Sequence, residues 1–226
     1  MSLERLYLKQ LEIGPMQNFV YLIGDRKTKE AAVIDAAWDI DAIIKAAASD
    51  DMKISKAFVT HFHPDHIGGS LYGLQIQGLS ELLSKLDVKI YANKEEVPYM
   101  KRMIGLADSD IITVESGNKT DIGDLSVQFI HTPGHTPGSQ CFLVDNKLVS
   151  GDTLFIGGCG RVDLPGSNPE DMYYSLTTKL KKLPDETILY PGHNYGGYQS
   201  TMGAEKRRNP YLQFHRLEEF LFSMGY

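Results

Sequence analysis

His61-Phe62-His63-Pro64-Asp65-His66 is the most informative stretch of this 226-residue chain, because three histidines and an aspartate fall within six residues. Histidine is the commonest metal ligand in proteins, and imidazole combined with carboxylate suits zinc, iron or manganese. Side chains two positions apart on an extended segment share a face, so His61 and His63 can hold one ion. Pro64 ends that extended run, and Asp65 and His66 then point elsewhere and can serve a second ion. The alternative is a polar loop with solvated histidines, and the density of ligand residues argues against it.

Three more candidate ligands each follow a predicted strand and sit beside glycine. They are His135 in Pro133-Gly134-His135-Thr136-Pro137-Gly138, Asp152 in Ser150-Gly151-Asp152-Thr153, and His193 in Tyr190-Pro191-Gly192-His193. A lone residue in such a place is usually a turn or capping residue. The segment upstream needs further donors, however, and loops at strand ends are where a rigid scaffold presents ligands. We therefore expect all three to join the metal site, with the Asp152 carboxylate able to bridge two ions.

Two other histidines are expected to lie outside the metal site. His131 precedes the Pro–Gly turn, and we expect it to be structural, hydrogen-bonded within that turn. His215 lies in a charged terminal helix and is expected at the surface. Cys141 stands in the apolar run Cys141-Phe142-Leu143-Val144 and is expected in the core.

Alternating apolar patterns and turn residues divide the chain into strands and helices. Strands are predicted over residues 5–13, 18–23, 31–35, 54–60, 88–92, 126–130, 140–144, 147–150 and 187–190. Helices are predicted over residues 40–48 with Asp39 as N-cap, and over 79–86, 94–103, 169–183, 203–208 and 215–224. The two halves of the chain each run through strands and end in helices. This order favours an α/β fold, with two β-sheets packed together and helices outside, in a single domain over residues 1–226.

Composition limits the classes of function. The formal net charge is −6, from 23 basic and 29 acidic residues, which argues against a nucleic-acid partner. Lys206-Arg207-Arg208 is interpreted as a solvated helix face. No stretch approaches the roughly 18 apolar residues of a membrane span. Two cysteines are too few for a disulfide framework, and residues 1–5 do not resemble a signal peptide, so a cytoplasmic location is expected.

The complete set of candidate ligands resembles the metallo-β-lactamase superfamily, and the resemblance extends from about Gln17 to Tyr195. It implies an αββα sandwich with the metal site at one edge of the two sheets. By this resemblance, His61, His63 and His135 hold one metal. Asp65, His66 and His193 hold the other, and Asp152 bridges.

Two branches of the superfamily share further sequence with this chain. The strings Gly151-Asp152-Thr153-Leu154-Phe155 and Gly158-Cys159-Gly160-Arg161 resemble both glyoxalase II (hydroxyacylglutathione hydrolase) and the persulfide dioxygenases, which act on glutathione adducts. The typical glyoxalase II carries a helical C-terminal domain for glutathione, and this chain ends too soon after His193 to hold one. Residues 73–86 depart from the compact form of both branches and are expected to shape the substrate pocket.

The leading functional hypothesis is hydrolysis of a thioester, such as an acyl-glutathione, by a metal-activated hydroxide. It implies two divalent metal ions, zinc first and iron as the open alternative, with Asp65 also orienting the nucleophile. Arg161 and Tyr195 are the candidate substrate-binding residues, although an exposed arginine is more often a surface charge. The expected partner is a small thiol-linked substrate, and a homodimer is left open.

Two rival hypotheses remain. In a persulfide dioxygenase, His61, His135 and Asp152 would bind a single Fe(II), and the remaining donors would surround it. A module that stores metal is the non-enzymatic alternative, and the open coordination positions of the predicted site argue against it.

Overall fold

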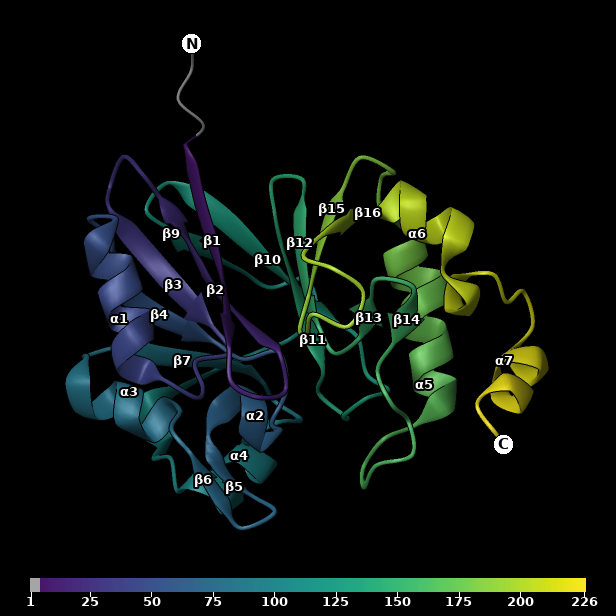
Figure 1. Cartoon of the computed structure of the whole chain (residues 1–226), viewed down its shortest axis with the longest axis horizontal. Helices are drawn as coiled ribbons and strands as arrows, with labels where there is room; N and C mark the ends of the chain where they lie inside the picture. The colour runs from purple at the N-terminus through teal and green to yellow at the C-terminus, as the bar shows by residue number, and fades with distance from the viewer. Residues whose placement is uncertain (1–4) are drawn as a thin grey trace.

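The chain forms two six-stranded sheets that pack face to face, with helices on both outer surfaces. The structure is a computed structural model that describes residues 5–226, so the expectation about a signal sequence at residues 1–4 lies outside it. In Figure 1, α1 (Ile40–Ser49) and α3 (Leu79–Lys85) cover one side, and α5 (Pro169–Tyr174), α6 (Met202–Arg208) and α7 (Leu217–Ser223) cover the other. The predicted αββα arrangement is confirmed.

The first sheet has the strand order β1-β2-β3-β4-β7-β8. Its strands are β1 (Leu6–Ile13), β2 (Asn18–Asp25), β3 (Glu30–Ile34), β4 (Lys53–Phe58), β7 (Lys89–Asn93) and β8 (Ile111–Val114). β2 pairs antiparallel with both β1 and β3, whereas β3, β4, β7 and β8 pair in parallel. Since parallel neighbours need a crossover, helices lie between them in the sequence and cover the outer face.

The second sheet has the order β16-β15-β12-β11-β10-β9. Its strands are β9 (Lys119–Ile122), β10 (Leu125–His131), β11 (Gln140–Val144), β12 (Lys147–Gly151), β15 (Ile188–Pro191) and β16 (Ser200–Thr201). Only β12 and β15 pair in parallel, and the chain between them contains α5. Two short hairpins complete the strands: β5 (Gly69–Leu71) with β6 (Leu74–Ile76), and β13 (Leu154–Phe155) with β14 (Gly158–Cys159).

Three apolar layers hold the sandwich together. Between the sheets, Phe58 packs edge-on against Phe129 and Tyr91, and the centroid of each of these two rings lies 5.4 Å from the centroid of Phe58. Buried residues such as Ile43 join α1 to the first sheet, and Cys141 lies fully buried in the third layer, as predicted. Burial of apolar area at roughly 25 cal/mol per Å² is the main force that joins these layers.

Two helices begin where the sequence analysis places a cap or a proline. Asp39 caps α1, as expected, because its side chain accepts a hydrogen bond from Ala42 N at 2.9 Å. Pro64 begins the single helical turn α2 (Pro64–Ile67), so the extended run does end there. His131 is bound within its turn, with Nε2 2.8 Å from Pro137 O, as predicted. His215 is exposed, as predicted, but it lies two residues before α7 and not within a helix.

Two predicted helices differ in extent. The helix expected from residue 94 is α4 (Val97–Ile104), because Asn93 accepts from Glu95 N at 3.0 Å and holds residues 93–96 in a turn. The helix expected over 169–183 is α5 only to Tyr174 and continues as a π-helical turn (Ser175–Lys179) and a 3-10 turn (Leu180–Lys182). The β5–β6 hairpin was not predicted. Within residues 5–226, no helix has both the length and the apolar character to cross a bilayer.

Candidate metal centre

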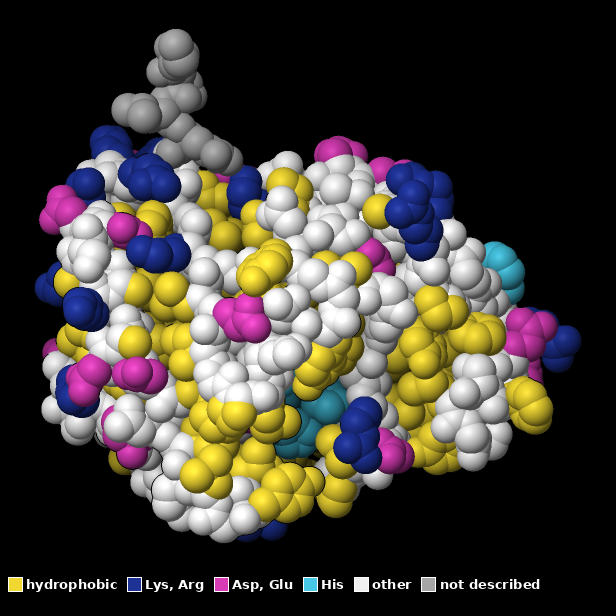
Figure 2. Space-filling view, in the orientation of Figure 1, with side chains coloured by type: hydrophobic (Ala, Val, Ile, Leu, Met, Phe, Trp, Pro, Cys, Tyr) yellow, Lys and Arg dark blue, Asp and Glu magenta, His cyan; other side chains and the backbone are white. Residues whose placement is uncertain are grey.

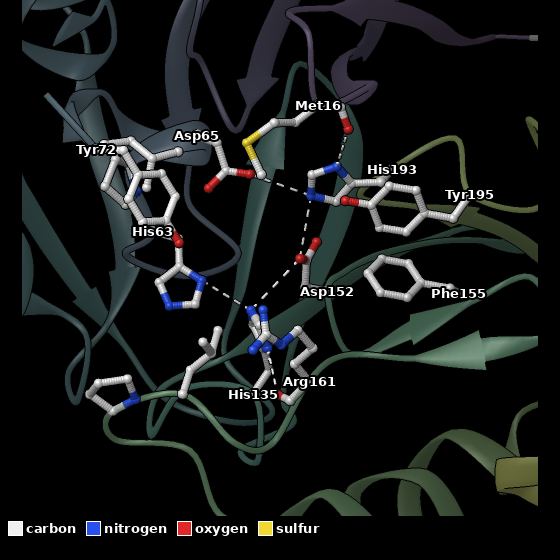
Figure 3. Close-up of a pocket in the computed structure, with 14 residues that line it drawn as sticks. Met16, His63, Asp65, Tyr72, His135, Asp152, Phe155, Arg161, His193 and Tyr195 are labelled. Carbon is white, nitrogen blue, oxygen red and sulfur yellow. Dashed lines mark hydrogen bonds and ion pairs between the residues drawn. The ribbon is translucent and has the colours of Figure 1, made fainter. Parts of the chain in front are cut away.

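All seven predicted donors converge at one edge of the sandwich, between the two sheets, and Figure 3 labels His63, Asp65, His135, Asp152 and His193 among them. Each comes from a loop or turn at the carboxyl end of a strand or just beyond it. His61, His63, Asp65 and His66 follow β4, His135 follows β10, Asp152 follows β12, and His193 follows β15. The first sheet therefore supplies four donors and the second sheet three, and neither half of the chain can build the site alone.

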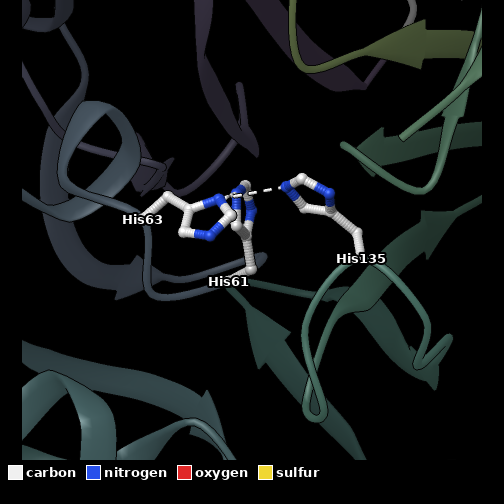
Figure 4. A group of neighbouring side chains, drawn as sticks. All are labelled: His61, His63 and His135. Atoms are coloured by element: carbon white, nitrogen blue, oxygen red, sulfur yellow. Dashed lines mark hydrogen bonds between the residues drawn. The ribbon is translucent and has the colours of Figure 1, made fainter. Parts of the chain in front are cut away.

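The first group of donors consists of His61, His63 and His135, shown in Figure 4. Nδ1 of His63 lies 3.1 Å from Nε2 of His61 and 3.0 Å from Nε2 of His135. Ligand nitrogens at 2.0–2.1 Å from a tetrahedral zinc ion lie about 3.3 Å from one another. The three ring nitrogens therefore stand close to the spacing that one metal ion requires.

The second group consists of Asp65, His66 and His193, all buried. Nε2 of His193 lies 3.2 Å from Nε2 of His66 and 3.4 Å from Oδ2 of Asp65. Asn18 fixes the carboxylate of Asp65, because its Nδ2 donates to Oδ2 at 2.9 Å, and Trp38 Nε1 in turn donates to Asn18 Oδ1 at 3.0 Å. The second group is therefore as compact as the first and is held by the fold.

Asp152 stands between the two groups. Its Oδ1 lies 3.5 Å from Nε2 of His66, and its Oδ2 lies 3.4 Å from Nε2 of His193 and 3.7 Å from Nε2 of His135. Gly192 makes room for it, since a Cβ at that position would lie 2.3 Å from Oδ1. Within residues 5–226, Oδ1 is one of two buried side-chain atoms without a hydrogen-bond partner. A buried carboxylate oxygen that no donor satisfies, facing imidazole nitrogens, fits a divalent metal ion.

The histidines are oriented through the ring nitrogen that faces away from the site. Four of them present Nε2 to the centre and place Nδ1 against a partner in the fold. The Nδ1 partners are Thr60 Oγ1 for His61 at 2.9 Å, Asp35 Oδ2 for His66 at 2.9 Å, Arg161 O for His135 at 2.8 Å and Met16 O for His193 at 2.9 Å. Such contacts select the tautomer and leave the Nε2 lone pair for a metal.

Asp35 supports both groups at once. Its Oδ2 meets Nδ1 of His66 and accepts from Oγ1 of Thr60 at 2.7 Å, and the same Thr60 oxygen contacts His61. Its Oδ1 accepts from Thr60 N at 2.8 Å. The residue adopts a left-handed backbone with φ of 57°, which is uncommon outside glycine and is favoured by aspartate among the exceptions. This turn at the end of β3 carries the carboxylate to the metal edge.

Burial and neighbouring charges set the protonation of the donors. Burial lowers the pKa of His63 to about 4 and also lowers the pKa of His61, which the surrounding histidines depress further. Burial raises the pKa of Asp152, but His193 and His66 more than offset it, so the pKa of Asp152 lies below its usual range. Burial likewise lowers the pKa of His66, yet Asp65 and Asp152 raise it well above normal. His61 and His63 are therefore neutral and ready to bind a cation, whereas the ionised carboxylates of Asp65 and Asp152 favour positive charge on His66, in the place where a metal ion would supply it.

Glu96, at the start of α4, links two of the ligand loops although it touches no donor. It is fully buried, and its Oε2 accepts from Phe62 N at 2.6 Å. Its Oε1 accepts from Gly138 N at 2.6 Å and from Thr136 Oγ1 at 2.8 Å. Phe62 lies between His61 and His63, and Thr136 follows His135. One carboxylate therefore joins the two loops that supply the first group of donors.

The donors open into a cavity of about 290 Å³. Figure 2 shows histidine side chains at the bottom of a hollow whose rim is largely hydrophobic. Both predicted substrate-binding residues line this cavity. The Tyr195 ring stacks on His193 with centroids 4.7 Å apart, and Arg161 pairs with Asp163 through hydrogen bonds of 2.9 and 2.8 Å. Their role toward a substrate stays a prediction.

Three supporting residues escaped the sequence analysis: Asn18, Asp35 and Glu96. Asn18 begins a strand, Asp35 directly follows one, and Glu96 follows the charged pair Lys94-Glu95. Each residue therefore has an ordinary local context. The signal that sequence does offer is weak. Asp35 is a charged residue at the end of the apolar run Ala31–Ile34, at the carboxyl end of a strand in the parallel part of the sheet, where sites are often built.

Comparison with known proteins identifies the family to which the chain belongs. The sequence profile described as the Metallo-beta-lactamase superfamily matches residues 13–193, a span that contains all seven donors. The chain belongs to the metallo-β-lactamase superfamily. Its members are enzymes, and the His and Asp groups at the sheet edge mark this member as one that binds divalent metal.

Relatives within the superfamily have different activities. The chain is 32% identical to the hydroxyacylglutathione hydrolase GloC of Haemophilus influenzae, over 89% of this chain and 97% of the relative. It is 31% identical to human mitochondrial persulfide dioxygenase ETHE1, over 97% and 81% of the two chains. It is also 31% identical to a probable polyketide biosynthesis zinc-dependent hydrolase, BaeB of Bacillus velezensis, over 90% and 85%. The crystal structure of ETHE1 from Myxococcus xanthus superposes with a TM-score of 0.82 at 31% identity, covering 96% of this chain and 89% of the other.

Proposed function

We propose that this protein is a dinuclear metal-dependent hydrolase that cleaves a thioester linking a small acyl group to a thiol. The observation that carries this proposal is the second group of donors. Asp65, His66 and His193 are as buried and as closely spaced as the first group, and the Asp152 carboxylate lies within 3.7 Å of a histidine nitrogen of each group. The spacing and the supporting hydrogen bonds of this second group match those of the first, which supports a second ion.

The metals expected are two divalent ions, with zinc preferred because five imidazoles and two carboxylates suit it. A relative whose name describes a zinc-dependent hydrolase supports that choice. Divalent ions in this position lower the pKa of bound water toward neutrality and polarise a carbonyl oxygen. His61, His63 and His135 would hold one ion, Asp65, His66 and His193 the other, and Asp152 would bridge them.

The chain's own residues would then position the reacting groups. Asp65 keeps its carboxylate ionised and fixed by Asn18, so it can accept a hydrogen bond from a water molecule in the centre and orient that water. The sulfur needs little assistance as a leaving group, because a free thiol has a pKa of about 8.5. Arg161 and Tyr195, at the cavity wall, are the groups that would meet the polar part of the thiol.

A persulfide dioxygenase is the second candidate. His61, His135 and Asp152 form a two-histidine, one-carboxylate set of the kind that binds Fe(II) in oxygenases. The likeness to two proteins described as ETHE1 favours it. However, the Asp152 carboxylate lies 3.4 Å from His193 and 3.5 Å from His66, both nearer than the 3.7 Å to His135. The geometry therefore does not single out His61, His135 and Asp152 as one set.

The deciding experiment measures metal content and turnover on the same preparation, purified without added metal. We expect about two metal ions per chain and release of free thiol from an acyl-glutathione. About one iron per chain, with oxygen consumed on glutathione persulfide and no thioester cleavage, would replace the hydrolase proposal with the dioxygenase one. His61→Ala should lose both metal and turnover. His215→Ala, an exposed histidine in the terminal region, is the matched control that should keep both.

A further inference from the structure

The β5–β6 hairpin has an unusual tip. Leu71 pairs with Leu74, so Tyr72 and Gly73 alone form the turn, and their φ angles are 50° and 83°. Two positive φ angles define a type I′ turn, whose first position usually holds Asn, Asp or Gly. A bulky residue there has an unfavourable backbone conformation. The Tyr72 side chain is 100% exposed, so burial in the core does not offset that cost.

The hairpin leads directly from the metal loop to the mouth of the cavity. It begins at Gly69, just after the helical turn that carries His66. Leu71 and Tyr72 both line the cavity that contains the donors. In Figure 3, Tyr72 lies on the side of His63, while Phe155 and Tyr195 lie on the other side, near His193. The strained tyrosine is therefore placed where it can meet a bound molecule.

The backbone at the base of the hairpin is tightly packed. Gly68, with φ of 87°, lies so close to Gly78 that a Cβ on Gly68 would stand 2.6 Å from the Gly78 Cα. Gly78 N also donates to Glu81 Oε2 at 2.7 Å, which ties the end of the hairpin to α3. A hairpin fixed at its base in this way presents its tip as a stable wall.

The wall beside His63 is apolar. Tyr72 lies on this side of the cavity, Leu71 is its neighbour in the hairpin and Pro64 follows His63, while Leu164 and Pro165 add further apolar surface to the cavity lining. Apart from the metal donors, Arg161 is the only charged residue among those lining the cavity, and Asp163 already pairs with it. Away from the metal centre, a charged group would find little compensation along this wall, whereas an apolar group would gain roughly 25 cal/mol for each Å² removed from water.

We propose that this wall is a binding site for an aliphatic or aromatic acyl group, and that Leu71 and Tyr72 determine acyl specificity. The acyl group would lie beside His63 with its carbonyl at the metal centre, and the thiol would lie toward Tyr195. This inference rests on the proposed function and specifies its substrate class.

The test compares acetyl, hexanoyl and benzoyl thioesters of one thiol. In the wild-type protein, kcat/KM should rise about tenfold or more from acetyl to hexanoyl, because each buried methylene adds favourable transfer free energy. In the Leu71→Ser, Tyr72→Ser double variant, that rise should shrink to less than about threefold. Leu74→Ser is the matched control. Leu74 pairs with Leu71 on the same hairpin and is 54% exposed, but it does not line the cavity, so the rise should persist.

Two outcomes would overturn the inference. One is an equal rise in the double variant and the wild type at equal metal content. The other is that the double variant changes kcat/KM when the thiol is enlarged and the acyl group is kept the same, but not when the acyl group is enlarged and the thiol is kept the same.

A binding measurement keeps the inference testable if no thioester is cleaved and the proposed function fails. Acetate, hexanoate and benzoate are titrated calorimetrically into the metal-loaded protein. Tighter binding of hexanoate and benzoate than of acetate, lost in the double variant and kept in Leu74→Ser, would support the apolar site on its own. Equal affinities in the wild type would rule it out whatever the reaction proves to be.

Discussion

Glu96 and Gly138 are in direct contact across the two halves of the molecule: Oε1 of Glu96 accepts from Gly138 N at 2.6 Å. A Cβ at position 138 would lie 2.6 Å from Cγ of Glu96, so only glycine permits this approach. The other oxygen accepts from Phe62 N. The loops that carry His61 and His135 are thus joined by a side chain of the fold itself, in addition to any metal between them.

Glu96→Gln should therefore weaken metal binding without touching a ligand. Glutamine has one acceptor oxygen, so either Phe62 N or Gly138 N loses its partner, and a buried unpaired amide costs about 1–3 kcal/mol. We expect the free energy of unfolding to fall by that amount and metal affinity to fall about tenfold. Competition with a chelator and urea titration measure the two effects. Glu95→Gln, its exposed neighbour, is the control, and equal behaviour of the two variants would refute the linking role.

Asp35→Asn tests how His66 is oriented. Asparagine cannot accept from both Thr60 and His66 through the same atoms, so the imidazole loses its fixed orientation. Loss of such a supporting contact costs about 10–100-fold in metal affinity or activity. Asp41→Asn is the control, because Asp41 makes only an exposed ion pair with Lys85. Unchanged chelator competition in Asp35→Asn would show that His66 keeps its position without this carboxylate.

His193→Ala separates the two groups of donors. The variant removes one member of the second group and leaves His61, His63 and His135 in place. We expect metal content to fall from about two ions per chain to about one, with turnover reduced at least about a hundredfold because the hydroxide-generating pair is lost. Elemental analysis and the thioester assay measure these effects. Retention of two ions would contradict the assignment of His193 to the second group.

Glu30 provides a prediction about pH. The Lys56 ammonium, the Ser55 hydroxyl and Gly123 N all bind its carboxylate and hold the pKa of Glu30 at about 2. Because the folded pKa lies below the unfolded one, this stabilisation is present above about pH 4.5 and is lost as pH falls toward 2. The group is partly exposed, so the contribution should be about 1–2 kcal/mol.

Glu30→Gln should accordingly be less stable than the wild type by that amount at pH 7, and the difference should shrink steadily between pH 4.5 and 3. Urea titrations at several pH values measure it, with Glu218→Gln on the exposed face of α7 as the control. A difference between Glu30→Gln and wild type that stays constant with pH would assign the effect to packing instead of ionisation.

The sandwich and the grouping of the seven donors could both be predicted from the sequence, because both leave local signals in it. Strands show as apolar runs, the His61–His66 segment follows one of them, and His135, Asp152 and His193 each follow another directly after a glycine. What the sequence could not reveal depends on contacts between distant segments. Glu96 is separated by 34 residues from Phe62 and by 42 from Gly138, and no local sequence pattern indicates that it contacts either of them.

The β5–β6 hairpin escaped for a different reason. Its strands have three residues each, which is too short for alternation to be recognised, and Tyr72 occupies a turn position where Asn or Gly would have been the signal. The helix after Pro169 was predicted too long as a regular helix because its sequence keeps helical spacing through the π-helical and 3-10 turns.

The separation of the donors along the chain also affects the order in which the protein can mature. His66 and His193 meet at 3.2 Å but are 127 residues apart. At about 5–20 residues per second, a ribosome needs roughly 6–25 seconds to add the second histidine after the first. At the start of that interval four of the seven ligands have been made; His135 and Asp152 are added during it, and His193 completes the set last. Metal that arrives then can be held only by an incomplete set, so correct loading must follow the synthesis of β15.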